Sequence, residues 1–138
     1  MSSIGDPPDT PRGIHLLVEY VGCDAEVLTD LMAIEGIMLE AARRASVTVL
    51  TRMFHKFGSD GVTGVVVVAE SHLSIHTWPE HAYAALDFFT CGVCSPEVAE
   101  AFVRVALGAQ YVQHVAISRG CGIGVGPIRS EGVSIVAP

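Results

Sequence analysis

The sequence predicts an α+β fold, a two-layer sandwich in which an antiparallel β-sheet carries helices on one face. Two observations support this prediction. Strand-like segments follow one another directly in the middle of the chain, and only two segments have helical spacing. Because consecutive strands joined by tight turns pair antiparallel, we expect both helices to cover a single face of one sheet.

The N-terminal part of the chain contains the first strand and the first helix. Residues 14–20 (IHLLVEY) are rich in β-branched and other apolar side chains, which is typical of a strand. Asp24 is a candidate N-cap for a helix that runs to about Ala45. The apolar positions of this helix recur at intervals of three or four residues. They are Val27, Leu28, Leu31, Ile34, Ile37, Met38 and Ala41.

A run of strand patterns follows this helix. Residues 47–57 are β-branched and aromatic, and residues 58–61 (GSDG) predict a turn. Residues 62–69 and 72–78 then form two strands that almost touch in sequence, and residues 82–91 form another. The middle of the chain is therefore expected to supply most of the sheet.

A second helix and a final strand complete the pattern. The Ser95-Pro96 pair is typical of a helix start, and this helix is expected to continue to about Leu107. Residues 111–118 are expected to form the last strand.

The length of 138 residues predicts one domain. Residues 1–12 are rich in Pro, Asp and Ser and are expected to form a disordered arm. Residues 13–120 are expected to form the domain, and residues 121–138 a loose, Gly-rich tail.

Composition limits the partners and the compartment. Half of the residues are hydrophobic and the mean hydropathy is +0.47, so we expect surplus apolar surface to be covered in a homodimer or larger assembly. A net charge of −7 argues against nucleic acid as a partner. No segment has the roughly 20 apolar residues of a membrane span, and the first residues do not resemble a secretory signal. The four cysteines are then expected to be reduced thiols of a cytoplasmic protein. They are Cys23, Cys91, Cys94 and Cys121.

The hairpin expected near residue 70 has an unusual tip. If Val68 pairs with Ser71, the loop is only Ala69-Glu70, and the same register brings Thr63 opposite His76. Tight hairpin loops favour Gly, Asn or Asp, which tolerate positive φ. We therefore predict backbone strain at the Glu70–Ser71 peptide bond.

The strand after this tip has a polar face. Alternate residues of a strand point to the same side. His72, Ser74, His76 and Trp78 therefore place two imidazoles and an indole on one face.

This segment also resembles a known family. ESHLSIHTWPEHAYAALDFFTCG (residues 70–92) is similar to the processing and active-site segment of the bacterial and archaeal S-adenosylmethionine decarboxylase proenzymes. The similarity continues upstream through FHKFGSDGVTG (54–64) and, more weakly, through GIHLLVEYVGCDAEVL (13–28). It covers roughly residues 13–92 and thins out in the C-terminal third.

The resemblance implies self-cleavage between Glu70 and Ser71. The Ser71 hydroxyl would attack the Glu70 carbonyl, the resulting ester would undergo β-elimination, and hydrolysis would leave a pyruvoyl group as the cofactor. The products would be a β chain of residues 1–70 and an α chain of residues 71–138. The pyruvoyl group would bind the substrate amine as a Schiff base and act as an electron sink, and the decarboxylated product would supply the aminopropyl group of spermidine.

The resemblance also implies roles for other side chains. Thr63 occupies the place of a serine that supports processing, and His76 that of the processing histidine. Cys91 is the implied acid that protonates the product carbanion. Among the substrate-binding residues, Phe57 would stack on adenine and Glu80 would hydrogen-bond the ribose. No metal site is implied.

Strand geometry adds a prediction about assembly. Ser71 and His76 are separated by about 16 Å of extended strand and have opposite parity, so they can scarcely meet within one hairpin. We therefore expect Thr63 and His76 of one subunit to serve Ser71 and Cys91 of the other, in a homodimer with shared active sites.

Three alternatives remain open. Some relatives with this chemistry decarboxylate arginine or ornithine, although Phe57 with Glu80 favours a nucleoside substrate. A metal- or redox-binding module is a second alternative, because Cys91 and Cys94 form a CxxC with His72, His76 and His81 nearby. A non-catalytic homologue that folds without cleaving is the third.

Overall fold

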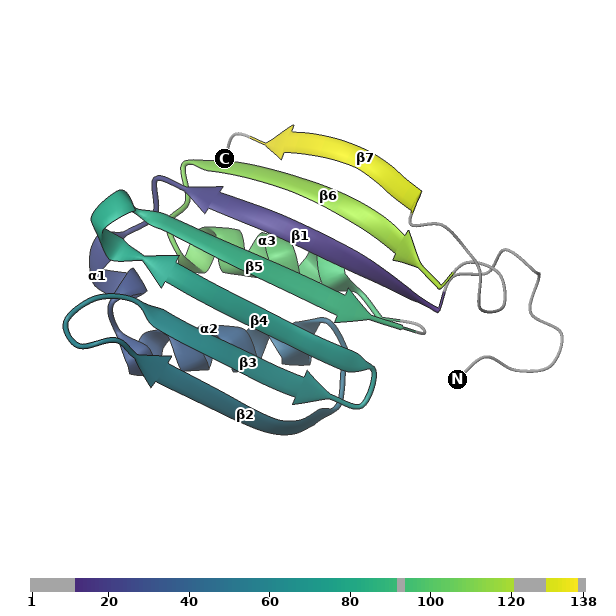
Figure 1. Cartoon of the computed structure of the whole chain (residues 1–138), viewed down its shortest axis with the longest axis horizontal. Coiled ribbons are helices and arrows are strands. Elements are labelled where there is room, and N and C mark those ends of the chain that lie inside the picture. The colour runs from purple at the N-terminus through teal and green to yellow at the C-terminus, as the bar shows by residue number, and fades with distance from the viewer. Residues whose placement is uncertain (1–11, 92–93, 121–128, 137–138) are drawn as a thin grey trace, which may run out of the picture.

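The computed structural model describes residues 12–91, 94–120 and 129–136, and it contains a seven-stranded antiparallel sheet (Figure 1). The strand order across the sheet is β2-β3-β4-β5-β1-β6-β7. The strands are β1 (Gly13–Val21), β2 (Val49–Lys56), β3 (Val62–Val68), β4 (Ser71–Trp78), β5 (Tyr83–Thr90), β6 (Tyr111–Arg119) and β7 (Arg129–Val136).

The helices α2 (Leu31–Arg44) and α3 (Pro96–Ala106) lie side by side behind the sheet, and the other face is open (Figure 1). A short helix, α1 (Ala25–Leu28), and a 3₁₀ turn, η1 (Pro79–His81), pack together at one end. The predicted two-layer α+β architecture is therefore confirmed.

The core lies between the sheet and these helices. Strand residues alternate between the two faces, and in β4 the residues Leu73, Ile75 and Thr77 are buried under the helices. The intervening polar residues of β4 point to the open face, as the sequence pattern predicts. The largest buried side chains are Tyr20, Phe88, Leu28, Ile34, Met38, Leu73, Ile75 and Leu107.

The predicted first helix is in fact two helices. α1 ends at Leu28, and α2 begins after Asp30, whose carboxylate accepts a hydrogen bond from the Ala33 backbone N–H. Asp24 caps α1 as predicted and accepts from the Glu26 N–H. The apolar spacing continues across the break, so periodicity alone does not reveal it.

Residues 111–118 form a strand as predicted, within β6, but this strand is not the last one. β7 pairs with β6 and forms an edge of the sheet, so part of the tail expected to be loose is a strand. The predicted disordered arm lies outside the described residues except for Arg12, whose N–H donates to the Arg119 carbonyl at 2.8 Å. Among the described helices, none is long and apolar enough to cross a membrane.

Candidate active site

The β3–β4 hairpin has the register that the sequence predicts. Val68 pairs with Ser71, and Thr63 pairs with His76. The Thr63 hydroxyl lies 3.1 Å from His76 Nδ1 on the open face of the sheet. The predicted pairing of a hydroxyl with an imidazole is therefore confirmed within one chain.

This pair lies in a hollow of about 280 Å³ at one end of the sheet. The hollow also contains the two residues expected to bind substrate, Phe57 and Glu80. Its complete lining is Phe57, Asp60, Gly61, Thr63, His76, Thr77, Trp78 and Glu80. Residues from separate segments of the chain thus form one concave, aromatic and acidic site. Sequence reasoning missed Asp60 and Gly61, because the GSDG pattern indicates only a turn.

Glu70, Ser71 and Cys91 meet at the opposite end of β4. The Glu70 carbonyl oxygen accepts a hydrogen bond from the Cys91 backbone N–H and another from its Sγ–H, each at 3.2 Å. The Glu70 carboxylate is itself held by the Thr48 N–H at 2.9 Å. Glu70 is therefore held through both its side chain and its carbonyl, and the carbonyl of the peptide bond predicted to break already faces hydrogen-bond donors.

Ser71 has a φ of 145°, a backbone conformation that residues with a Cβ rarely adopt. No glycine relieves this position, and β4 continues directly from it into the sheet. The strain predicted at the Glu70–Ser71 bond is therefore present on its C-terminal side.

The Ser71–Cys91 pair and the Thr63–His76 pair do not meet within one chain. Ser71 lies at the start of β4 and Cys91 directly follows β5. Thr63 and His76 lie at the opposite end of the hairpin, near the start of β3 and the end of β4. Among the described residues, no interaction joins Ser71 to His76.

A polar network on the open face has no counterpart in the sequence-based predictions. Asp87 accepts hydrogen bonds from His15 Nε2 at 2.7 Å, from His72 Nε2 at 3.4 Å and from the Ser74 hydroxyl. The ring of Phe89 stacks on His15 with centroids 5.0 Å apart. The signal in the sequence was a single carboxylate in an otherwise apolar strand, ALDFF.

The environment of Asp87 favours its charged form. Partial burial acts to raise the pKa of this carboxyl, but the hydrogen bonds from Ser74 and His15 and the attraction of the two imidazoles outweigh it, so the pKa lies below its usual value. Asp87 and the two histidines have ligand atoms within 4.8 Å of one another. Their hydrogen bonds satisfy the carboxylate without a cation.

Among the described residues, neither cysteine of the CxxC joins the histidines in a candidate metal group. Cys94 Sγ donates to the Cys91 carbonyl at 3.1 Å. Burial, followed by the charge of Glu70 and the neighbouring Cys91, raises the pKa of Cys94, whereas a redox-active or metal-binding thiol needs a lowered one. His76 and His81 lie outside the candidate metal group found among the described residues.

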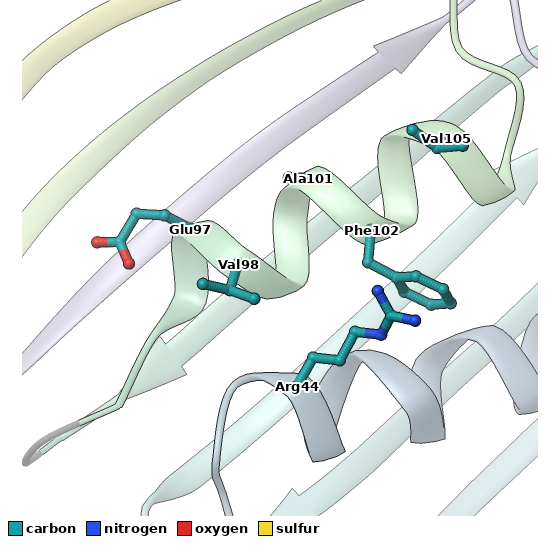
Figure 2. Close-up of a pocket in the computed structure, with 6 residues that line it drawn as sticks. All are labelled: Arg44, Glu97, Val98, Ala101, Phe102 and Val105. Carbon is teal, nitrogen blue, oxygen red and sulfur yellow. The ribbon is translucent and has the colours of Figure 1, made fainter.

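A second hollow, of about 700 Å³, lies on the outer surface of α2 and α3 (Figure 2). Its lining is Arg44, Glu97, Val98, Ala101, Phe102 and Val105, and the Arg44 guanidinium sits 4.3 Å from the Phe102 ring centroid. The sheet separates it from the open face, and it contains none of the predicted catalytic residues.

Comparison with known proteins gives the same assignment as the fold and the residue pattern. A family profile described as S-adenosylmethionine decarboxylase matches residues 14–120. The S-adenosylmethionine decarboxylase proenzyme of Pyrococcus horikoshii is 49% identical over 109 residues, covering 78% of each chain. That of Thermodesulfovibrio yellowstonii is 44% identical over 109 residues, covering 78% of this chain and 81% of its own.

Solved structures agree with this result. The adenosylmethionine decarboxylase from Aquifex aeolicus has a TM-score of 0.76 at 30% identity, covering 86% of this chain and 98% of its own. The Trypanosoma brucei enzyme has a TM-score of 0.58 at 13% identity, with 75% of this chain matching 45% of that one, which shows a shared fold. The fold and its relatives define a decarboxylase. More specifically, the chain belongs to the S-adenosylmethionine decarboxylase family.

Proposed function

We propose that this chain is a precursor that cleaves itself between Glu70 and Ser71 and then decarboxylates S-adenosylmethionine. The observation that carries the proposal is the strained Ser71, at φ 145°, in a family whose relatives are proenzymes. The cleavage would give chains of residues 1–70 and 71–138. The product would serve as an aminopropyl donor.

The surroundings of Ser71 suit a cofactor made from its own side chain. A pyruvoyl group at this position would supply the electron sink for decarboxylation. The Cys91 thiol, which now donates to the Glu70 carbonyl, would lie beside the reacting carbon and hold the proton that completes the reaction. Cys91 is therefore the proposed acid.

The hollow at the other end of the hairpin suits a nucleoside with a positive charge. Phe57 is half exposed and borders the hollow, so its ring can stack on a base. Glu80 supplies a carboxylate for ribose hydroxyls, and Asp60 adds a second negative charge. A sulfonium substrate would be attracted by both carboxylates.

A complete site requires two copies of the chain, because Ser71 and Cys91 lie at one end of β4 and Thr63 and His76 at the other. In a homodimer with two-fold symmetry, two copies of β4 that run in opposite directions bring unlike ends together. The open sheet face offers exposed apolar surface for this contact, including Leu17, Met53, Val67 and Trp78. We propose that the partner's face supplies Thr63 and His76 to support processing, with His76 as the base in the elimination.

Mass spectrometry of the purified protein tests the cleavage. We expect two chains, the second beginning with a pyruvoyl group at position 71, and a single uncut chain for Ser71→Ala. Release of CO₂ from S-adenosylmethionine, compared with arginine and ornithine, then tests the substrate. An uncut wild-type chain with an ordinary serine would contradict the proposal, and faster release from arginine or ornithine would contradict its substrate.

A further inference from the structure

We propose that His72, held by Asp87, is the base that activates Ser71 for the first step of self-cleavage, within a single chain. The inference rests on the proposed self-processing and assigns its first step to two residues that the proposed function leaves without a role. His72 would be the catalytic residue and Asp87 a positioning residue.

The three side chains form a series that starts at the scissile bond. His72 Nδ1 lies 3.4 Å from Ser71 Oγ, and His72 Nε2 lies 3.4 Å from Asp87 Oδ2. A nucleophile, an imidazole and a carboxylate in this order are the components of an activated serine. Both distances are long for hydrogen bonds, as is common before a catalytic site tightens around its reaction.

The irregular backbone at Ser71 explains how adjacent residues can make this contact. Neighbouring residues of a regular strand point to opposite faces. With φ at 145°, Ser71 departs from the regular strand, and its Oγ approaches the imidazole on the open face. The strain and the contact are thus two aspects of one local geometry.

Asp87 sets the orientation and tautomer of His72. In the neutral tautomer that donates from Nε2–H to this carboxylate, Nδ1 carries no proton and can accept the one from Ser71. Asp87 is fixed in turn by His15 and Ser74 from the neighbouring strands. On the neighbouring strand β3, the residue opposite His72 is Val67, which is apolar and offers no competing hydrogen bond.

The Glu70 carbonyl group, which Ser71 would attack, is also positioned by residues of the same chain. The Glu70 carbonyl oxygen accepts from the Cys91 N–H at 3.2 Å, where the negative charge of a tetrahedral intermediate would develop. The partner subunit is therefore not needed for the attack.

The step balances without another reactant. His72 Nδ1 takes the proton of Ser71 Oγ, and the oxygen forms a bond to the Glu70 carbonyl carbon. The bond from that carbon to the Ser71 nitrogen then breaks, and the nitrogen takes the proton back from His72. An ester replaces the amide, and elimination from this ester is a separate, later step.

The test follows full-length chains made by cell-free translation, sampled over time on denaturing gels with and without hydroxylamine, which cleaves esters. For His72→Gln we expect cleavage at least 100-fold slower, with no hydroxylamine-sensitive chain, because the ester does not form. For His76→Ala we expect the uncut chain to become hydroxylamine-sensitive, because the ester forms and elimination stalls. Added imidazole should partly restore cleavage of His72→Ala.

Two further variants separate chemistry from structure. Asp87→Asn should slow cleavage about tenfold or more, and Asp87→Glu, which keeps the negatively charged carboxylate, should recover part of that loss. His15→Gln removes the other imidazole that donates to Asp87. Because the His15 side chain does not contact Ser71, this change should slow cleavage far less than His72→Gln. Circular dichroism and elution volume establish that each variant folds.

Three results would overturn the inference: cleavage of His72→Gln within about threefold of wild type, an ester accumulating in His72→Gln, or equal slowing by His15→Gln. The failure of the proposed function is distinct, because the wild-type chain itself would then remain uncut.

Discussion

At position 71 the chain places a serine where glycine would cost less. A residue held in such a conformation is strained by about 1–3 kcal/mol. Neither Ser71→Gly nor Ser71→Ala can cleave, so both can be unfolded as intact chains. A glycine in a strand normally makes a protein less stable than an alanine there, by about 0.5–1 kcal/mol. At this position we expect the reverse, with the free energy of unfolding of Ser71→Gly about 1 kcal/mol higher than that of Ser71→Ala in urea. An Ala variant that is the more stable of the two would show that the backbone at this position is relaxed.

A second prediction at the residue scale concerns pH and Asp87. Its pKa is lower in the folded chain than in the unfolded one, so its charge stabilises the fold above the ordinary carboxyl pKa of about 3.9. This stabilisation is lost as the pH falls through the lowered folded value. In an uncut Ser71→Ala background, Asp87→Asn should therefore lower the free energy of unfolding at pH 6.5, and the difference should shrink toward pH 3. A difference that is the same at both pH values would contradict this.

At the scale of elements, the register of the β3–β4 hairpin was predictable because it follows from a two-residue loop. The opposition of Thr63 and His76, and the polar face of β4, follow from that register and from alternation alone. The break between α1 and α2 was not predictable, because Thr29 and Asp30 interrupt the helix without interrupting its apolar spacing. β7 was missed because glycines precede a strand that depends on pairing with β6.

The sequence predicted the arrangement of site residues only where they belong to one continuous segment. Phe57 and Glu80 line the same hollow although they come from the β2–β3 turn and from η1, and no local sequence pattern indicates this arrangement. The network around Asp87 joins three strands, and β1 is far from the other two in sequence. Only the folded chain therefore reveals that His15 and His72 share one carboxylate.

One buried hydroxyl ties the elements at the hollow together. Thr77 Oγ1 donates to the Leu28 carbonyl of α1 at 2.7 Å and accepts from the Val62 N–H of β3 at 2.8 Å. Thr77→Val has nearly the same shape but leaves both backbone groups buried and unpaired. We expect it to destabilise an uncut Ser71→Ala chain by about 2–4 kcal/mol in urea unfolding. Thr29→Val, whose hydroxyl is exposed, is the control and should cost less than about 1 kcal/mol. Equal effects would contradict the bridging role.

At the scale of the whole molecule, the two ends of β4 divide the chemistry. One chain holds the bond proposed to break, with hydrogen-bond donors on its carbonyl, and the same chain holds the hollow with Thr63 and His76, but these two parts do not meet. Because of this division, we expect that a monomer does not contain a complete active site. The division itself follows from the length of β4 and from the opposite parity of Ser71 and His76.

Complementation between two inactive chains tests this division. Ser71→Ala lacks the nucleophile but keeps His76, whereas His76→Ala keeps the nucleophile. When the two are co-expressed with different tags, each mixed dimer should contain one intact shared site. We expect the His76→Ala chain to be cleaved only in the presence of the other variant, while the Ser71→Ala chain stays uncut. Since the second site of each mixed dimer carries both changes, decarboxylation should not exceed about half of the wild-type rate. Purification through both tags isolates the mixed dimers, and an uncut His76→Ala chain within them would mean that the site does not cross between subunits.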